Sequence, residues 1–196
     1  TFIHKGVKSN KKSNSLELFC PYKINWSGKS DIKFIRDFES VEKLNLLPKH
    51  NIIGMYFNEI MYYLTKNDYR IEKLYDHYDN SLRNLKYSND LLANLNNYEI
   101  GILLLTGHYL VFDTDINGNA IDCKKKYSYL PDFGPKIVSG DKDTYSGETL
   151  IALSGQQPYN SKSIKESRLL MKRLIDYYIQ PKKVKTREIL KYISLK

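Results

Sequence analysis

The longest apolar run of the chain, residues 91–112, constrains most strongly what the chain can fold into. Its apolar residues recur at spacings of three, four and seven, the period of an α-helix, and form a broad stripe. The stripe consists of Leu92, Leu95, Tyr98, Ile102, Leu103, Leu104, Leu105 and Tyr109. Because an almost all-round apolar helix must be buried, we predict that this is the central helix and that other helices surround it. Gly101, Gly107 and His108 interrupt the run, which is too short to cross a bilayer, since a spanning helix needs about 20 apolar residues.

The net charge of +9 is unevenly distributed along the chain. Residues 1–40 carry eight basic and four acidic residues, and residues 162–196 carry eleven and three. The middle, residues 41–161, carries twelve basic and fifteen acidic residues. Two basic ends indicate a polyanionic partner such as nucleic acid, or less often an anionic membrane surface.

The first 40 residues have the alternation of β-strands. Strands are predicted at residues 1–7, 16–26 and 31–39, with a basic loop at residues 8–15. Ile35 is out of phase with Ile32 and Phe34 in the third strand, which indicates a bulge. Three strands of this kind resemble part of a small barrel.

From Val41 onward the pattern changes to helices. Besides the central helix, helices are predicted at residues 51–65, 69–87, 146–155, 160–180 and 185–194. Asn117-Gly118, between residues 111–116 and 119–124, predicts a type I′ hairpin, and residues 127–140 are expected to be loop or short strand. We therefore expect an α+β protein with a partial barrel at residues 1–42 and a helical domain with a small β-hairpin insertion at residues 43–196.

The stretch DTDINGN at residues 113–119 resembles the start of an EF-hand calcium loop. Position 12 of that loop should be a bidentate Glu, and here it is Lys124. A cation at this position argues against calcium, and a hairpin explains Asn117-Gly118 without any ion. Cys20 and Cys123 are the two cysteines of the chain and have no CxxC spacing, so neither a disulfide framework nor a zinc site is expected.

Catalytic motifs are not evident. The four histidines, His4, His50, His77 and His108, stand apart, and no GxSxG, HExxH or phosphate-binding glycine loop occurs. We expect no cofactor and no enzymatic activity. The enzyme alternative is a metal-dependent nuclease that uses Asp113, Asp115 and Asp122.

The basic residues are the better functional signal. In the strand region they are interleaved with Phe2, Phe19, Tyr22, Trp26 and Phe34, a combination with which OB-type folds bind single strands. The residues predicted to bind DNA are Lys5, Lys8, Lys11, Lys12, Lys29, Lys33, Arg36, Lys182, Lys183, Lys185 and Arg187. The alternative to a DNA-binding protein is an adaptor whose basic ends bind acidic protein segments, with DNA contact secondary.

Six short stretches, in order, resemble motifs of the RecO family of bacterial recombination mediators. In the strand region, KGVK at residues 5–8 resembles the family's KGAR stretch, and LFCPY at residues 18–22 resembles its LxPF strand. The stretch GKSDIK at residues 28–33 is similar to the GRGEVK turn and strand.

Three further motifs fall in the helical region. The stretch GMYFNEI at residues 54–60 is similar to the GLYINEL helix, and KTRE at residues 185–188 resembles the terminal LKSREL. Tyr98-Glu99 with residues 104–108 resembles the FE…LLxxLGY region. The order and spacing of all six stretches identify the chain as a member of the RecO family.

The resemblance implies an N-terminal OB barrel followed by a helical C-terminal domain. It also implies binding to single- and double-stranded DNA, strand annealing, and joint action with RecR to load RecA onto DNA coated by the single-stranded-DNA-binding protein. A cytoplasmic, nucleoid-associated bacterial protein is expected. The family's first two barrel strands have no counterpart here, so the barrel is incomplete unless an upstream segment exists. Some members have a cysteine zinc site after the central helix, whereas this chain has only Cys123 there.

The family also implies a protein partner for the helical domain. RecO proteins receive the acidic, hydrophobic C-terminal tail of the single-stranded-DNA-binding protein there, which requires an apolar pocket with cations at its rim. The family's Arg-Arg pair before the FE motif is replaced by Asn96-Asn97. We therefore expect the tail to rely on the basic helix. The predicted tail-binding residues are Tyr98, Ile102, Arg168, Lys172 and Arg173.

Overall fold

The computed structural model describes residues 2–3, 16–29, 32–65, 70–140 and 143–192. The chain divides into two compact units, Thr1–Asn45 and Leu46–Lys196. The division lies close to the boundary predicted after residue 42.

The first unit contains a three-stranded sheet in the order β1-β3-β2. Strand β3 (Lys33–Ser40) pairs in parallel with β1 (Phe2–Ile3) and antiparallel with β2 (Tyr22–Ser27). The register of the β2–β3 ladder shifts between Asn25 and Trp26, which lie opposite Asp37 and Ile35, so the bulge predicted in the third strand is confirmed. Within the described residues this is an open sheet, and it does not confirm the predicted OB barrel.

The predicted second strand, residues 16–26, is wrong in its first half, because β2 begins only at Tyr22. Pro21 has no amide proton to donate to a ladder, and Phe19 has a left-handed backbone with φ 57°. The segment is instead held by local contacts. The amide of Val41 donates to the carbonyl of Pro21 at 2.9 Å, and Cys20 Sγ donates to the carbonyl of Glu42 at 2.9 Å.

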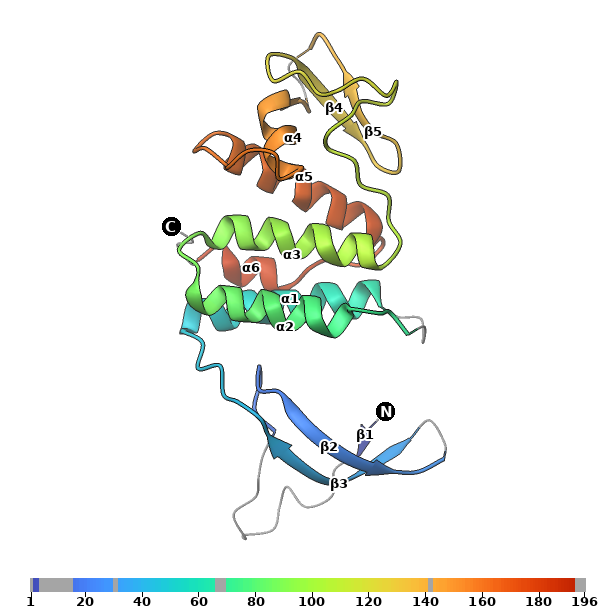
Figure 1. Cartoon of the computed structure of the whole chain (residues 1–196), viewed down its shortest axis with the longest axis vertical. Coiled ribbons are helices and arrows are strands. Elements are labelled where there is room, and N and C mark those ends of the chain that lie inside the picture. Colours follow the sequence, from blue (N-terminus) through green and yellow to red (C-terminus); the bar gives the residue numbers. More distant parts are fainter. Residues whose placement is uncertain (1, 4–15, 30–31, 66–69, 141–142, 193–196) are drawn as a thin grey trace. The chain divides into compact units, whose positions relative to one another are not determined.

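The second unit is built around α3 (Leu91–Leu105), which contacts α1 (Pro48–Leu64), α2 (Leu74–Tyr87) and α5 (Ser163–Tyr178). Figure 1 shows α3 between the α1–α2 pair and α5, so the predicted central helix is confirmed. The remaining elements are α4 (Gly147–Leu153), α6 (Thr186–Leu190), β4 (Lys126–Leu130), β5 (Gly134–Ile137) and β6 (Tyr145–Ser146), with sheet order β5-β4-β6. Among the described residues, no helix has the length and hydropathy needed to cross a membrane.

The central helix is shorter than predicted. It begins at Leu91, where the Asp90 side chain accepts a hydrogen bond from the amide of Ala93 at 2.9 Å, and it ends at Leu105 instead of Phe112. Two residues later Gly107 has a φ of 86°, a conformation that favours glycine and ends helices. The expected stripe is also too broad, because Leu104 is 51% exposed.

The predicted type I′ turn is wrong. Gly118 has a positive φ of 81°, but Asn117 does not, and a type I′ turn requires both. The amide of Gly118 donates to the carbonyl of Asp115 at 2.8 Å, and the flanking residues form one isolated bridge, Thr114 with Ala120. The regular hairpin of this unit is β4–β5, within the stretch expected to be loop or short strand.

Glu59 on α1 fixes the start of α6. Its carboxylate accepts hydrogen bonds from the amides of Lys185 at 2.8 Å and Thr186 at 2.9 Å, and from the Thr186 hydroxyl at 2.7 Å. Burial opposes the charged carboxylate, but these hydrogen bonds outweigh burial and lower the pKa of Glu59. Two segments more than 120 residues apart in sequence are thereby joined.

A buried ion pair joins α3 to α5. Glu99 is fully buried, and its carboxylate accepts hydrogen bonds from both terminal nitrogens of Arg168, at 2.5 Å and 2.9 Å. The Tyr56 hydroxyl of α1 also donates to Glu99. Arg168 donates further to Asn96 Oδ1 at 2.8 Å, and Asn96 donates to Ser167 at 2.7 Å. The buried carboxylate is therefore paired and hydrogen-bonded, as a charge in a protein interior must be.

Gly101 allows α2 and α3 to approach closely. A Cβ added there would lie 2.1 Å from Cε1 of His77 on α2, a distance that the ring cannot accommodate without moving. His77 also stacks on Tyr98 with ring centroids 5.4 Å apart, and its Nε2 lies 3.1 Å from the Tyr98 carbonyl oxygen. The interruption of the apolar run by glycine thus has a packing function.

We predict that Glu99→Gln lowers the free energy of unfolding by about 3–5 kcal/mol, because Arg168 loses its counter-charge in a buried setting. Arg168→Met should cost a similar amount, and the double variant should cost less than the sum of the two. Urea unfolding measures all three, and the exposed substitution Glu72→Gln is a control expected to stay within about 0.5 kcal/mol of the parent. Strictly additive losses would contradict a coupled pair.

We also predict that Gly101→Ala destabilises the protein by about 1–3 kcal/mol through overpacking, although alanine favours a helix by about 1 kcal/mol over glycine. In a His77→Ala background the same substitution should be neutral or stabilising, because the clashing ring is gone. Thermal unfolding followed by circular dichroism measures both. A Gly101→Ala variant more stable than the parent would show that the two helices are not in close contact.

Candidate nucleic-acid interface

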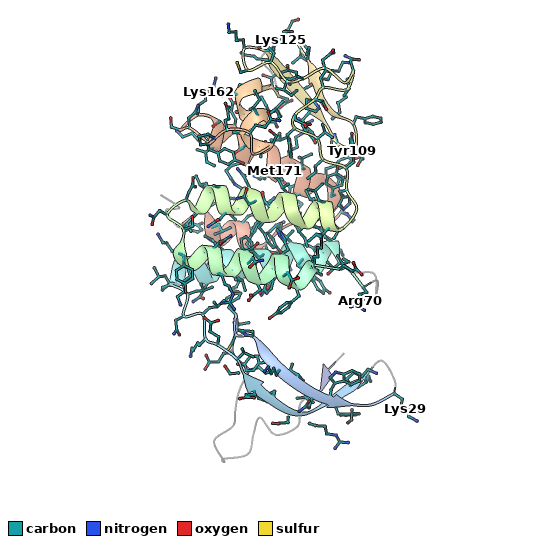
Figure 2. The ribbon with its side chains drawn as sticks, in the orientation of Figure 1. Lys29, Arg70, Tyr109, Lys125, Lys162 and Met171 are labelled. Carbon is teal, nitrogen blue, oxygen red and sulfur yellow. The ribbon has the colours of Figure 1, made fainter. Side chains whose placement is uncertain are left out.

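One of the predicted basic residues of the first unit, Lys33, lies beside Trp26 of β2. Trp26 is 51% exposed, and Lys33 Nζ lies 4.7 Å from the centroid of its ring. Lys29 extends from the turn between β2 and β3 (Figure 2), and Arg36 Nε donates to Ser27 Oγ at 2.7 Å. An exposed indole beside cations is an arrangement that can stack on a base while the cations neutralise phosphates. The other predicted residues of this unit, Lys5, Lys8, Lys11 and Lys12, lie outside the described residues.

The basic residues predicted near the C-terminus divide into two groups. Lys182, Lys183 and Lys185 are exposed on the segment between α5 and α6. Arg187, also predicted to bind DNA, differs from these lysines, because its side chain is only 15% exposed and forms an ion pair with Asp176. Its guanidinium also lies 5.7 Å from the centroid of the Tyr56 ring, so it is engaged in the interior.

Three of the predicted tail-binding residues cannot face a partner. Tyr98 is 1% exposed and donates its hydroxyl proton to the carbonyl of Phe57 at 2.7 Å, and Ile102 has no exposed area. Arg168 is committed to Glu99, and its side chain is 19% exposed. The prediction of these three residues is therefore wrong, because helical periodicity locates the buried face of α3 but not a surface pocket.

The other two predicted tail-binding residues, Lys172 and Arg173, do lie at a surface hollow. It has a volume of about 500 Å³ and lies on the outer side of α5. Leu169 and Tyr177 on the same helix are 65% and 44% exposed and give it apolar walls. The full lining is Pro131, Leu169, Lys172, Arg173, Asp176, Tyr177 and Gln180.

The sequence interpretation missed the apolar part of this hollow. The helix predicted at residues 160–180 contains Leu169, Leu170, Leu174 and Tyr177, and the prediction did not divide them between a buried and an exposed face. Leu170 and Leu174 are buried, whereas Leu169 and Tyr177 are spaced by eight residues and form a second row on the exposed side. The signal was available, because adjacent leucines cannot share one face of a helix.

Two of the three acidic residues of the nuclease alternative, Asp115 and Asp122, have local roles. Asp115 is 6% exposed, and its Oδ1 accepts hydrogen bonds from the amides of Asn117 and Asn119, both at 2.9 Å. These hydrogen bonds lower the pKa of Asp115, and the one from the Asn119 amide has the largest effect. Asp122 Oδ1 accepts from the amide of Lys124 at 2.9 Å. Across the described ranges, no three His, Cys, Asp or Glu side chains are grouped to hold a metal ion.

Comparison with known proteins gives a consistent result. The family model for the C-terminal part of recombination protein O matches residues 48–188. A DNA repair protein RecO from Coxiella burnetii is 34% identical over 190 residues, which cover 95% of this chain and 81% of that protein. The DNA repair protein RecO of Methylococcus capsulatus is 26% identical over 98% of this chain, and that of Polynucleobacter necessarius is 29% identical over 96%.

The matched region includes α1 to α5 and the start of α6, and therefore the Glu59 cap, the Glu99–Arg168 pair and the hollow on α5. The relatives extend the similarity through the first unit. The chain thus belongs to the RecO family of DNA repair proteins.

Proposed function

We propose that this protein is a DNA-binding recombination mediator that catalyses no bond chemistry. In this proposal it binds single- and double-stranded DNA at the nucleoid and anneals strands. With RecR, it helps load RecA onto single-stranded DNA coated by the single-stranded-DNA-binding protein. Membership of the RecO family supports the proposal, as does the concentration of positive charge at the two ends of the chain.

The observation that carries the proposal is the exposed Trp26 ring with the Lys33 ammonium group 4.7 Å from its centroid. A base stacked on an aromatic ring gains about 1–3 kcal/mol whatever its identity, because every base has a π-face. Phosphate contacts from Lys29 and Lys33 add affinity that is equally independent of sequence. A mediator that acts on any exposed single strand needs this kind of recognition.

We further propose that the acidic tail of the single-stranded-DNA-binding protein binds the hollow on α5. Leu169 and Tyr177 offer apolar contact, and Lys172 and Arg173 offer cations at the rim, the two features that such a tail requires. Of the tail-binding residues predicted from the sequence, this proposal keeps the cations Lys172 and Arg173. Leu169 and Tyr177 replace the buried Tyr98 and Ile102 as the apolar contacts.

An adaptor for acidic protein segments is the second candidate, and the same hollow favours it. In that case peptide affinity would be retained while DNA affinity would be weak at physiological salt. A nuclease would cleave DNA on addition of magnesium or manganese. The local roles of Asp115 and Asp122 in their turns argue against it.

We predict that Lys29→Glu/Lys33→Glu/Arg36→Glu weakens single-strand binding by at least about tenfold, because three phosphate contacts become repulsive. The loss should be nearly equal for oligonucleotides of different sequence. The control triple, Lys124→Glu/Lys136→Glu/Lys165→Glu, reverses three exposed lysines elsewhere and changes the net charge equally. Fluorescence anisotropy measures the affinities, and equal losses in both triples would show that net charge alone acts.

We predict that two variants, Lys172→Glu/Arg173→Glu and Leu169→Asp, each bind a labelled acidic tail peptide at least about tenfold more weakly than the parent. The first variant removes the cations of the hollow, and the second removes an apolar wall. Lys136→Glu/Lys165→Glu serves as the charge-matched control and should bind like the parent. Circular dichroism confirms that each variant folds. Parent-like affinity in Leu169→Asp would place the tail elsewhere on the protein.

A further inference from the structure

The charge that lines the hollow on α5 is not uniform. Lys172 and Arg173 are its cations, and Asp176 is the carboxylate among its lining residues. Asp176 follows Lys172 by one helical turn, about 6 Å along the axis of α5, so the two side chains project from the same face of the helix. A ligand that contacts the whole hollow therefore meets a positive half and then a negative half.

The counter-ion of Asp176 lies outside this hollow. The Asp176 carboxylate pairs with the Arg187 guanidinium of α6, and within the described part of the chain Arg187 lines an adjoining hollow between α5 and α6 and not this one. Among the described residues, neither Lys172 nor Arg173 is ion-paired with Asp176. The Asp176 side chain is 46% exposed, so its carboxylate presents negative charge to a ligand in the hollow on α5.

The ion pair also holds Asp176 in position. The Arg187 side chain is 15% exposed, and its Nη2 donates a hydrogen bond to the Tyr56 hydroxyl at 3.4 Å. Rotation of the Asp176 carboxylate away from Arg187 would leave this mostly buried cation without its counter-charge, which is costly. An acidic side chain brought beside Asp176 therefore meets a fixed charge of the same sign, and such a contact disfavours binding.

A second carboxylate adds to the negative half of the hollow. Asp132, in the turn between β4 and β5, accepts hydrogen bonds from the hydroxyls of Tyr177 at 3.2 Å and Tyr178 at 3.1 Å. Tyr177 is a wall of the hollow and follows Asp176 in sequence, and the charge of Asp132 raises the pKa of the Tyr177 hydroxyl. The positive half of the hollow thus lies toward Leu169, and the negative half lies toward Tyr177.

We propose that Asp176 is a specificity determinant that makes the hollow on α5 selective for a peptide whose acidic residues are confined to one end. The acidic residues lie beside Lys172 and Arg173, and the residue beside Asp176 is neutral or cationic. Since an extended peptide advances about 3.3 Å per residue, the two positions are about two residues apart. The inference rests on the proposed binding of an acidic tail and adds the charge pattern that such a tail must carry.

The test compares the affinities of the full chain for three labelled peptides with blocked ends. Two patterned peptides carry three aspartates and three serines on opposite sides of two leucines, one in each order, so that both directions of binding are covered. The uniform peptide has aspartates in place of the serines. Fluorescence anisotropy measures the affinities at about 0.15 M salt, where charges more than about 8 Å away are largely screened.

The parent should bind one of the patterned peptides at least about fivefold more tightly than the uniform peptide, because like charges oppose each other at Asp176. General attraction to a basic protein predicts the opposite order, since the uniform peptide carries more negative charge. The comparison within the parent protein therefore tests the inference without any substitution.

Asp176→Asn should raise the affinity for the uniform peptide by at least about fivefold and change that for the preferred patterned peptide by less than about twofold. Asp176→Glu should restore the preference of the parent, because the negative charge is kept. Glu188→Gln is the matched control, since it removes one exposed carboxylate from the adjoining hollow, and it should also keep that preference. Circular dichroism confirms the fold of each variant.

Four results overturn the inference. If the parent binds the uniform peptide as tightly as both patterned peptides, or more tightly, Asp176 does not select the ligand, although the proposed tail binding stands. An unchanged preference in Asp176→Asn would assign the selectivity to other residues. An equal gain in Glu188→Gln would reduce the effect to net charge. No binding of any of the three peptides by the parent would remove both the inference and the proposed tail site.

Discussion

The ion pair of Glu99 and Arg168 is the interaction on which the helical unit depends most. It joins α3 to α5, and the Tyr56 hydroxyl brings α1 to the same carboxylate. Removing either charge leaves the other buried without compensation, which is far more costly than the pair itself is favourable. The pair also fixes the rotation of α5, and with it the direction in which Leu169, Lys172 and Arg173 face solvent.

The motifs by which the chain resembles its family are explained by this framework. Tyr56 and Glu59 come from the GMYFNEI stretch, Glu99 follows Tyr98, and Thr186 belongs to the KTRE stretch. The Tyr56 hydroxyl donates a hydrogen bond to the Glu99 carboxylate. The Glu59 carboxylate accepts hydrogen bonds from the amide and the hydroxyl of Thr186. In this unit, therefore, the motifs that indicate the family mark residues that hold helices together, and the candidate binding surfaces lie beside them.

Sequence patterns predicted the number and order of the main helices, because apolar period and capping residues such as Asp90 act locally. They did not predict the end of α3, where Gly107 stops the helix although apolar residues continue. Charge was harder to interpret than hydrophobicity. Arg168 and Arg187 have the same composition signal as exposed arginines, and only the tertiary positions of Glu99 and Asp176 reveal that both are engaged.

The most direct test of the account is the salt dependence of single-strand binding by the unmodified protein. Binding through phosphates releases counterions, so log affinity should fall linearly with log salt, with a slope of about −0.7 for each phosphate contacted. We expect a slope of about −3 or steeper, which corresponds to four or more contacts, and the same slope for oligothymidylate and a mixed sequence. A flat salt response, or an affinity confined to one sequence, would contradict a nucleic-acid interface made of lysines and exposed aromatic rings.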